Sequence, residues 1–135
     1  MMRNLDIRAI VLATLAVFGI DFFTGIMLFA VFSEPLTHPS DEQLRTAAAA
    51  LARDPGYLRS LLVLGTASTG VGGYLVARIA RSIPYFNALA YGVLAVVLSI
   101  WGTTELPTWF RVVGISLTLP AALLGGYFAK RPIGK

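Results

Sequence analysis

The sequence predicts an all-α protein: a four-helix transmembrane bundle with a short extramembrane amphipathic helix between spans 1 and 2. Two observations lead to this prediction. Hydrophobic residues make up 56% of the 135 residues and charged residues only 13%, which is far from the balance of a soluble domain. The apolar residues also fall into four runs, each long enough to cross a bilayer. The length fits a single integral membrane domain, residues 1–135.

The four spans follow from these runs and from the prolines between them. The first span is predicted over residues 10–32, which is too long a run for the core of a signal peptide. At a rise of 1.5 Å per residue it covers roughly 35 Å, enough to cross a bilayer with some tilt. Turns at Pro84 and Pro107 separate the other three, predicted over residues 58–80, 85–103 and 108–129.

A polar segment between the first two spans carries signals for a helix of its own. Ser40 followed by Gln43 is a capping-box pattern. The helix should end before Asp54-Pro55-Gly56, so we predict it over residues 41–53. Its apolar face is weak and rich in alanine. We therefore expect it to lie against the membrane surface or to cap the bundle.

Small residues gather on one face of the second span and again near the end of the fourth. Because helices in lipid associate where small side chains let their backbones approach, we expect these faces to pack against other helices. The predicted packing residues are Gly65, Thr69, Gly72, Gly73, Gly125 and Gly126. The sequences Gly72-Gly73-Tyr74 and Gly125-Gly126-Tyr127 also indicate either a duplicated helical hairpin or a chance recurrence of glycine-rich helix ends.

The basic residues predict the orientation. With four spans, one side carries the larger group: Arg3, Arg8, Arg78, Arg81, Lys130, Arg131 and Lys135. The other side carries Arg45, Arg53, Arg59 and Arg111. The positive-inside rule therefore places both termini in the cytoplasm. Arg59 and Arg111 should extend outward along their alkyl stems. The net charge of +4 fits lipid headgroups as the partner and not nucleic acid.

Asp21 is the acid inside a predicted span, near the middle of residues 10–32. An ionisable side chain at that depth is costly and marks a candidate functional site. No Lys, Arg or His lies at comparable depth, so we expect a neutral acid that bonds to hydroxyl or backbone groups. The candidate site residues are Asp21, Thr24, Thr66, Ser68 and Thr69. Two interpretations stay open: a proton-carrying carboxyl, or an acid that only joins helices or binds a partner subunit.

Other chemistry finds no support in the sequence. There is no cysteine, so a sulfur-based metal site is excluded. His38 stands alone in a loop, and no arrangement of nucleophile and base is present. We therefore expect no enzyme activity, no cofactor and no metal.

The segment from Gly72 to Arg81, GGYLVARIAR, resembles a motif at the end of the second span in small four-span bacterial membrane proteins. The resemblance implies a multi-pass protein of the bacterial cytoplasmic (inner) membrane and implies no particular activity. Size and span number are also similar to those of small multidrug transporters, which carry a carboxylate in their first span. This chain has an aspartate there and a much longer first loop.

The leading functional hypothesis is a non-enzymatic accessory or scaffold subunit that packs against itself or against another membrane protein. The alternative is a small proton-coupled transporter with Asp21 as the proton-carrying carboxylate. A weaker third hypothesis is a membrane-surface binding module built on residues 41–53. The environment of Asp21 separates the first two, because a carrier needs the carboxyl in contact with water and a scaffold needs it in a dry interface.

Overall fold

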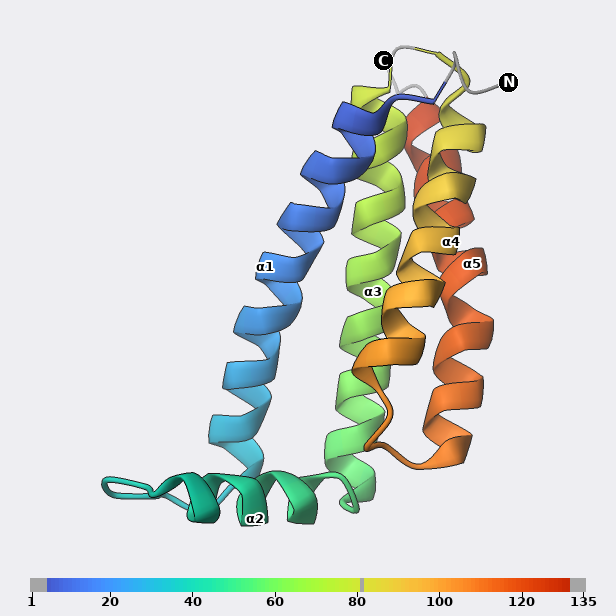
Figure 1. Cartoon of the computed structure of the whole chain (residues 1–135). Helices are drawn as coiled ribbons and strands as arrows, with labels where there is room; N and C mark the ends of the chain where they lie inside the picture. Colours follow the sequence, from blue (N-terminus) through green and yellow to red (C-terminus); the bar gives the residue numbers. More distant parts are fainter. Residues whose placement is uncertain (1–4, 81, 132–135) are drawn as a thin grey trace.

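The structure of the protein is a computed structural model that describes residues 5–80 and 82–131. Over those ranges it contains five helices and no strand: α1 (Ile7–Phe32), α2 (Asp41–Leu51), α3 (Pro55–Ile79), α4 (Pro84–Gly102) and α5 (Thr108–Lys130). Four of them, α1, α3, α4 and α5, are long and apolar enough to cross a membrane. The predicted fold class is confirmed, with α2 as the short helix between the first two spans (Figure 1).

Side-chain caps set where the helices begin. The Ser40 hydroxyl accepts from the Gln43 amide and the Gln43 side chain accepts from the Ser40 amide, so the capping box at α2 is present. At α3 the Asp54 carboxylate accepts from the Tyr57 amide, 2.9 Å away. Pro55 takes the first helical position, where its missing N–H costs nothing. This cap starts α3 ahead of its apolar run, which is why the predicted start at residue 58 was late.

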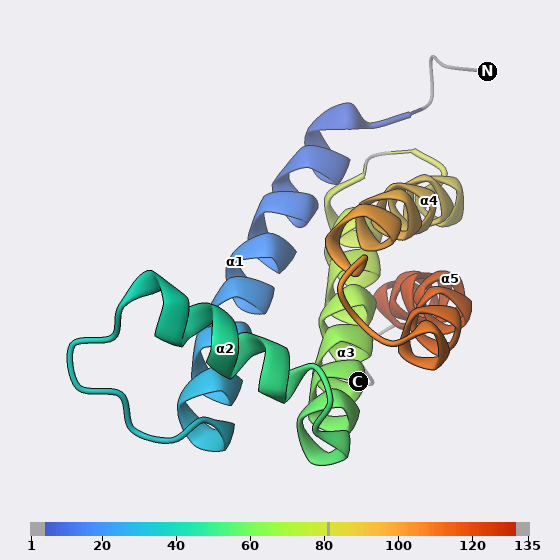
Figure 2. The ribbon, with the colours of Figure 1, turned by 60° about the horizontal axis from the view of Figure 1, so that its bottom comes forward.

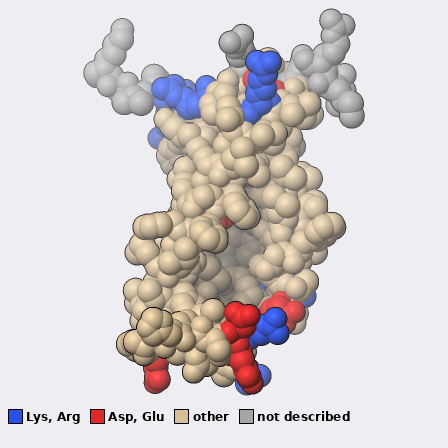
Figure 3. All heavy atoms as spheres, turned by 60° about the vertical axis from the view of Figure 1, so that its left-hand side comes forward, with Lys and Arg blue, Asp and Glu red and all other residues tan. Residues whose placement is uncertain are grey.

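The spans alternate in direction. Helices α1 and α4 run one way and α3 and α5 run back, so the start of α1 and the end of α5 lie at the same end of the bundle (Figure 1). We call this the terminal end. At the opposite end, the α2 end, α2 lies across the bundle (Figure 2). Basic side chains dominate the terminal end in Figure 3, and both signs of charge meet at the α2 end. Arg3, Arg81 and Lys135 lie outside the described residues.

Helices α3 and α5 meet backbone to backbone. A Cβ added to Gly73 would collide with the carbonyl of Ala122, and one added to Gly125 would collide with the carbonyl of Gly70. Gly72 faces the ring of Tyr91 on α4, while Gly126 faces the Cβ of Ala88, also on α4. The small residues near the terminal end of α3 and α5 therefore pack as predicted, because only glycine fits this close approach.

Gly65 and Thr69 do not belong to this seam, contrary to the prediction. A Cβ added to Gly65 would meet no atom within 4 Å. Both residues instead line a cavity between the spans. Toward the α2 end α1 diverges from α4, and the cavity occupies that part of the bundle. The same small-residue face of α3 therefore packs along one half and borders open space along the other.

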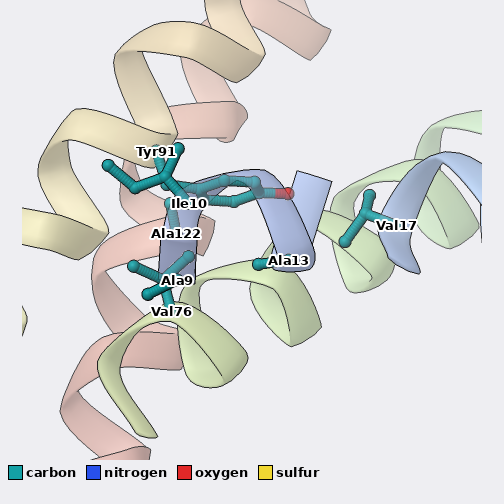
Figure 4. Close-up of a cluster of buried hydrophobic side chains, with 7 residues drawn as sticks. All are labelled: Ala9, Ile10, Ala13, Val17, Val76, Tyr91 and Ala122. Atoms are coloured by element: carbon teal, nitrogen blue, oxygen red, sulfur yellow. The ribbon is translucent and has the colours of Figure 1, made fainter. Parts of the chain in front are cut away.

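An apolar cluster closes the terminal half of the bundle. It joins all four spans and consists of Ala9, Ile10, Ala13, Val17, Val76, Tyr91 and Ala122 (Figure 4). Tyr91 is 2% exposed and lies with its hydroxyl directed to the side where Val17 is found. The cluster therefore forms the packed core of the terminal half among the described residues.

Asn87 ties the terminal ends of α1 and α4 together. Its side chain is fully buried, with 0% exposure. The Asp6 amide donates to the Asn87 Oδ1 at 2.7 Å, and the Asn87 Nδ2 donates to the carbonyls of Ser82 at 2.8 Å and Ile83 at 3.1 Å. The hydrogen bonds of Asn87 thus hold the start of α1 beside the turn that precedes α4.

The remainder of α1 is loosely covered. It leans away from α4 toward the α2 end, as Figures 1 and 2 show. Beyond Val17, Leu28 is the one further residue of α1 that is buried. Near the end of the helix the rings of Phe32 and Tyr57 pack edge to face, with centroids 5.9 Å apart. α1 is therefore attached along α3 and is open on the side of α4.

Candidate functional site

A cavity of about 450 Å³ lies between α1, α3, α4 and α5. It extends from Thr14 on α1, past Asp21 half-way along that helix, to Arg111, one turn inside the α2 end of α5. Figure 3 shows the corresponding face hollowed, with an acidic group visible inside. The volume falls within the roughly 300–1,000 Å³ that small-molecule sites occupy. Because Val17 and Tyr91 belong both to the lining and to the apolar cluster, the cavity ends where the packed half begins.

Asp21 is in the lining of this cavity and is exposed. The Ser68 hydroxyl is 2.5 Å from the Asp21 Oδ1 and 2.9 Å from the carbonyl of Gly65. A serine hydroxyl has a single proton, so it cannot donate to both oxygens at once. Ser68 is placed to donate to either oxygen, and if Asp21 carries a proton, the carboxyl can donate to Ser68 while Ser68 donates to Gly65.

The ionised form of Asp21 would use the same atoms differently. Ser68 would then turn its proton toward the carboxylate and release the carbonyl of Gly65. That carbonyl also accepts from the Thr69 hydroxyl at 2.9 Å, so it keeps a side-chain partner. Loss or gain of a proton at Asp21 therefore needs only the rotation of one hydroxyl, with no movement of the helices.

The hydroxyls of the cavity fall into two chemical groups. One group donates to a carbonyl in the preceding turn of its own helix and offers the cavity only lone pairs: Thr14, Thr69, Ser99, Thr103 and Thr118. In the second group, Thr24, Thr66 and Tyr91 have no hydrogen bond to any described residue. Their hydroxyls can both donate and accept. The inner part of the cavity can therefore bind a polar group of either kind.

Arg111 is placed differently from the prediction. Its position near a span end predicted a side chain directed outward to lipid headgroups. In the structure Arg111 lines the cavity, and its Nε is buried without a hydrogen-bond partner among the described residues. The direction of the side chain depends on how α5 is rotated against α3 and α4, which hydropathy does not specify.

The predicted site residues come together in this region. Asp21, Thr24, Thr66 and Thr69 line the cavity, and Ser68 contacts Asp21 from the adjacent turn of α3. Sequence reasoning missed Tyr91 and Arg111. Tyr91 carries a polar tip in the interior of an apolar span, and that was the available signal for it. Within residues 5–80 and 82–131, no three His, Cys, Asp or Glu side chains are grouped so as to hold a metal ion.

Comparison with known proteins identifies no relative. No protein-family model, no curated protein and no solved structure matches this chain.

Proposed function

We propose that this protein is a small, non-enzymatic carrier of the bacterial cytoplasmic membrane that binds its substrate in the cavity and exchanges a proton at Asp21. One observation supports this proposal most directly: the cavity lies mainly in the half of the bundle toward the α2 end and stops at the apolar cluster, and Asp21 is in its lining. A carboxyl at mid-depth that faces a cavity is the arrangement expected of a proton relay.

The orientation completes the proposal. With the basic terminal end in the cytoplasm, the positive-inside rule is satisfied and the cavity faces the outside. The structure then corresponds to an outward-facing state. Transport requires a second state in which the apolar cluster around Tyr91 separates and the cavity closes at the α2 end.

The experiment compares Asp21→Asn with the wild-type protein in liposomes that contain a pH-sensitive dye. A carrier should couple proton movement to the entry of a substrate, and Asp21→Asn should abolish that coupling because an amide cannot release a proton. Its folding should change by about 1 kcal/mol or less, the usual size of a polar contact between membrane helices. Glu34→Gln is the matched control, since Glu34 is exposed in the loop after α1 and should leave coupling unchanged.

The second candidate is an accessory or scaffold subunit, and the exposure of Asp21 also supports it. Asp21 borders a shallow surface groove with Phe22, Gly25, Ile26 and Phe29 on the open side of α1. A carboxyl facing lipid at that depth is unfavourable, so a helix from a second copy or a partner protein could cover it. A stable complex in mild detergent that is lost in Phe22→Ser, without any proton coupling in liposomes, would favour the scaffold.

A further inference from the structure

We infer that the ligand of the cavity is an organic anion with an apolar body, and that Arg111 binds its negative group. This inference rests on the proposed use of the cavity as a substrate site. It adds the chemical class of the substrate, which proton exchange at Asp21 does not by itself define.

The guanidinium of Arg111 supplies the first part of the argument. Its Nε is buried at the wall of the cavity and finds no acceptor among the described residues. A buried donor without a partner is unfavourable, and a carboxylate or phosphate is the acceptor whose geometry a guanidinium fits best. A cationic side chain in the cavity wall, with a buried donor that has no partner among the described residues, therefore favours an anionic group at the α2 end of the cavity.

The start of α5 adds to the positive electrostatic potential around Arg111. α5 begins at Thr108, one turn before Arg111, and no side chain caps its start. The positive end of the helix dipole is therefore directed to the same region. Asp21, the acid of the cavity, lies about half the length of α1 away from this end, and its contacts with Ser68 are satisfied in the neutral form.

The wall between Arg111 and Asp21 defines the body of the ligand. It consists mainly of large apolar side chains, among them Leu61, Leu98 and Ile115. An apolar segment of a ligand would be covered there. The free hydroxyls of Thr24, Thr66 and Tyr91 lie toward the inner end and can bind a further polar group. A carboxylate with one alkyl chain or an aromatic ring fits this cavity, whose wall is polar at Arg111, apolar in the middle and polar again near the free hydroxyls.

The charges of such a substrate explain why a proton would accompany it. One anion moving inward with one proton on Asp21 transfers no net charge, so the membrane potential does not oppose its entry. Arg111 remains in place and keeps its charge throughout. No other ion is needed for this balance.

Equilibrium binding tests the inference. Three probes with the same eight-carbon chain, octanoate, octanol and octylamine, are titrated into the purified protein in phosphatidylcholine nanodiscs, and tryptophan fluorescence reports binding. Octanoate should bind at least about tenfold more tightly than octanol, the factor expected of a charge-assisted hydrogen bond, and octylamine should bind least. Arg111→Gln should remove the preference for octanoate and Arg111→Lys should restore part of it.

Two further variants make the result specific. Arg59→Gln removes an exposed arginine at the same end of the bundle and should change octanoate affinity less than twofold. Gly65→Leu fills the cavity at a position where a side chain meets no atom, while Gly19→Leu adds the same group outside the cavity. The first should abolish binding of all three probes and the second should not.

The outcomes separate this inference from the proposed function. Equal affinity for octanoate and octanol, or an unchanged preference in Arg111→Gln, overturns the inference even if some substrate still moves with protons. Tight binding of octanoate without any coupled flux overturns the proposed carrier and leaves the anion site standing. If phosphatidylglycerol in the nanodisc displaces octanoate completely, Arg111 binds a lipid headgroup and the inference of a free organic anion fails.

Discussion

Gly73 on α3 lies directly against the carbonyl group of Ala122 on α5, and the space between them is too small for a methyl group. Each helix therefore presents bare backbone to the other at this level of the membrane. Since α3 also contacts α1 and α4, this contact positions the central helix of the bundle.

The first prediction compares two glycines of α3. Gly73→Ala should lower the free energy of unfolding by about 1–3 kcal/mol, because the added methyl group forces α3 and α5 apart. Gly65→Ala should be neutral or stabilising by up to about 1 kcal/mol, since alanine favours the helix and the site is open. Thermal unfolding in detergent measures both. Equal losses in the two variants would mean that α3 and α5 do not meet at Gly73.

The second prediction concerns Asn87. Asn87→Leu should destabilise the protein by about 1–3 kcal/mol, because the Asp6 amide loses its buried acceptor and two carbonyls lose their donor. Asn87→Asp keeps an acceptor for Asp6 but places a carboxyl at a fully buried site beside two carbonyl oxygens, so it should destabilise the protein at least as much. The same unfolding assay gives the order. Identical stability of Asn87→Leu and the wild type would contradict the bond network at the terminal end.

The third prediction concerns the protonation of Asp21. A lipid-soluble carbodiimide reacts with a protonated carboxyl that it can reach, so it should modify Asp21, which is exposed half-way along α1 and is expected to be neutral there. Asp54 lies at the start of α3, outside the apolar run, where it accepts the cap hydrogen bond from Tyr57, and it should react far less with a lipid-soluble reagent. Mass spectrometry of digested protein locates the adduct. Preferential modification of Asp54 would argue that Asp21 is ionised or covered.

The fourth prediction is the topology. Because the chain has no cysteine, single cysteines at Ser40 and at Gly134 can be labelled selectively. An impermeant thiol reagent added to intact cells should reach position 40 only, and position 134 should react after the cells are opened. Gly134 lies beyond the described residues. Labelling of both positions from the outside would rule out four spans with cytoplasmic termini.

Much of the fold was predictable because the bilayer imposes strong local rules. Long apolar runs identified the spans, and the patterns at Ser40 and at Asp54-Pro55 lie where α2 and α3 begin. Only the boundaries moved: α1 begins at Ile7, capped by Asp6, ahead of the predicted residue 10. α2 ends at Leu51, short of the predicted residue 53.

The site was only half predictable. Asp21 could be found because a carboxyl within a span is rare. Gly65 and Gly73 have the same small size, and a small residue is suited both to a tight contact and to the wall of a cavity. Whether such a residue lies in a tight contact or in the wall of a cavity depends on where the helices diverge, which the sequence does not specify. Arg111 and Tyr91 became visible as site residues only when α4 and α5 were placed around the cavity.

The edge-to-face contact between Phe32 and Tyr57 has a mechanical consequence. With the apolar cluster at one end of α1 and this contact at the other, α1 is held at both of its ends. Its middle, where Asp21 lies, has few contacts with α4. A force on α1 would therefore be transmitted first to α3, and only weakly to α4.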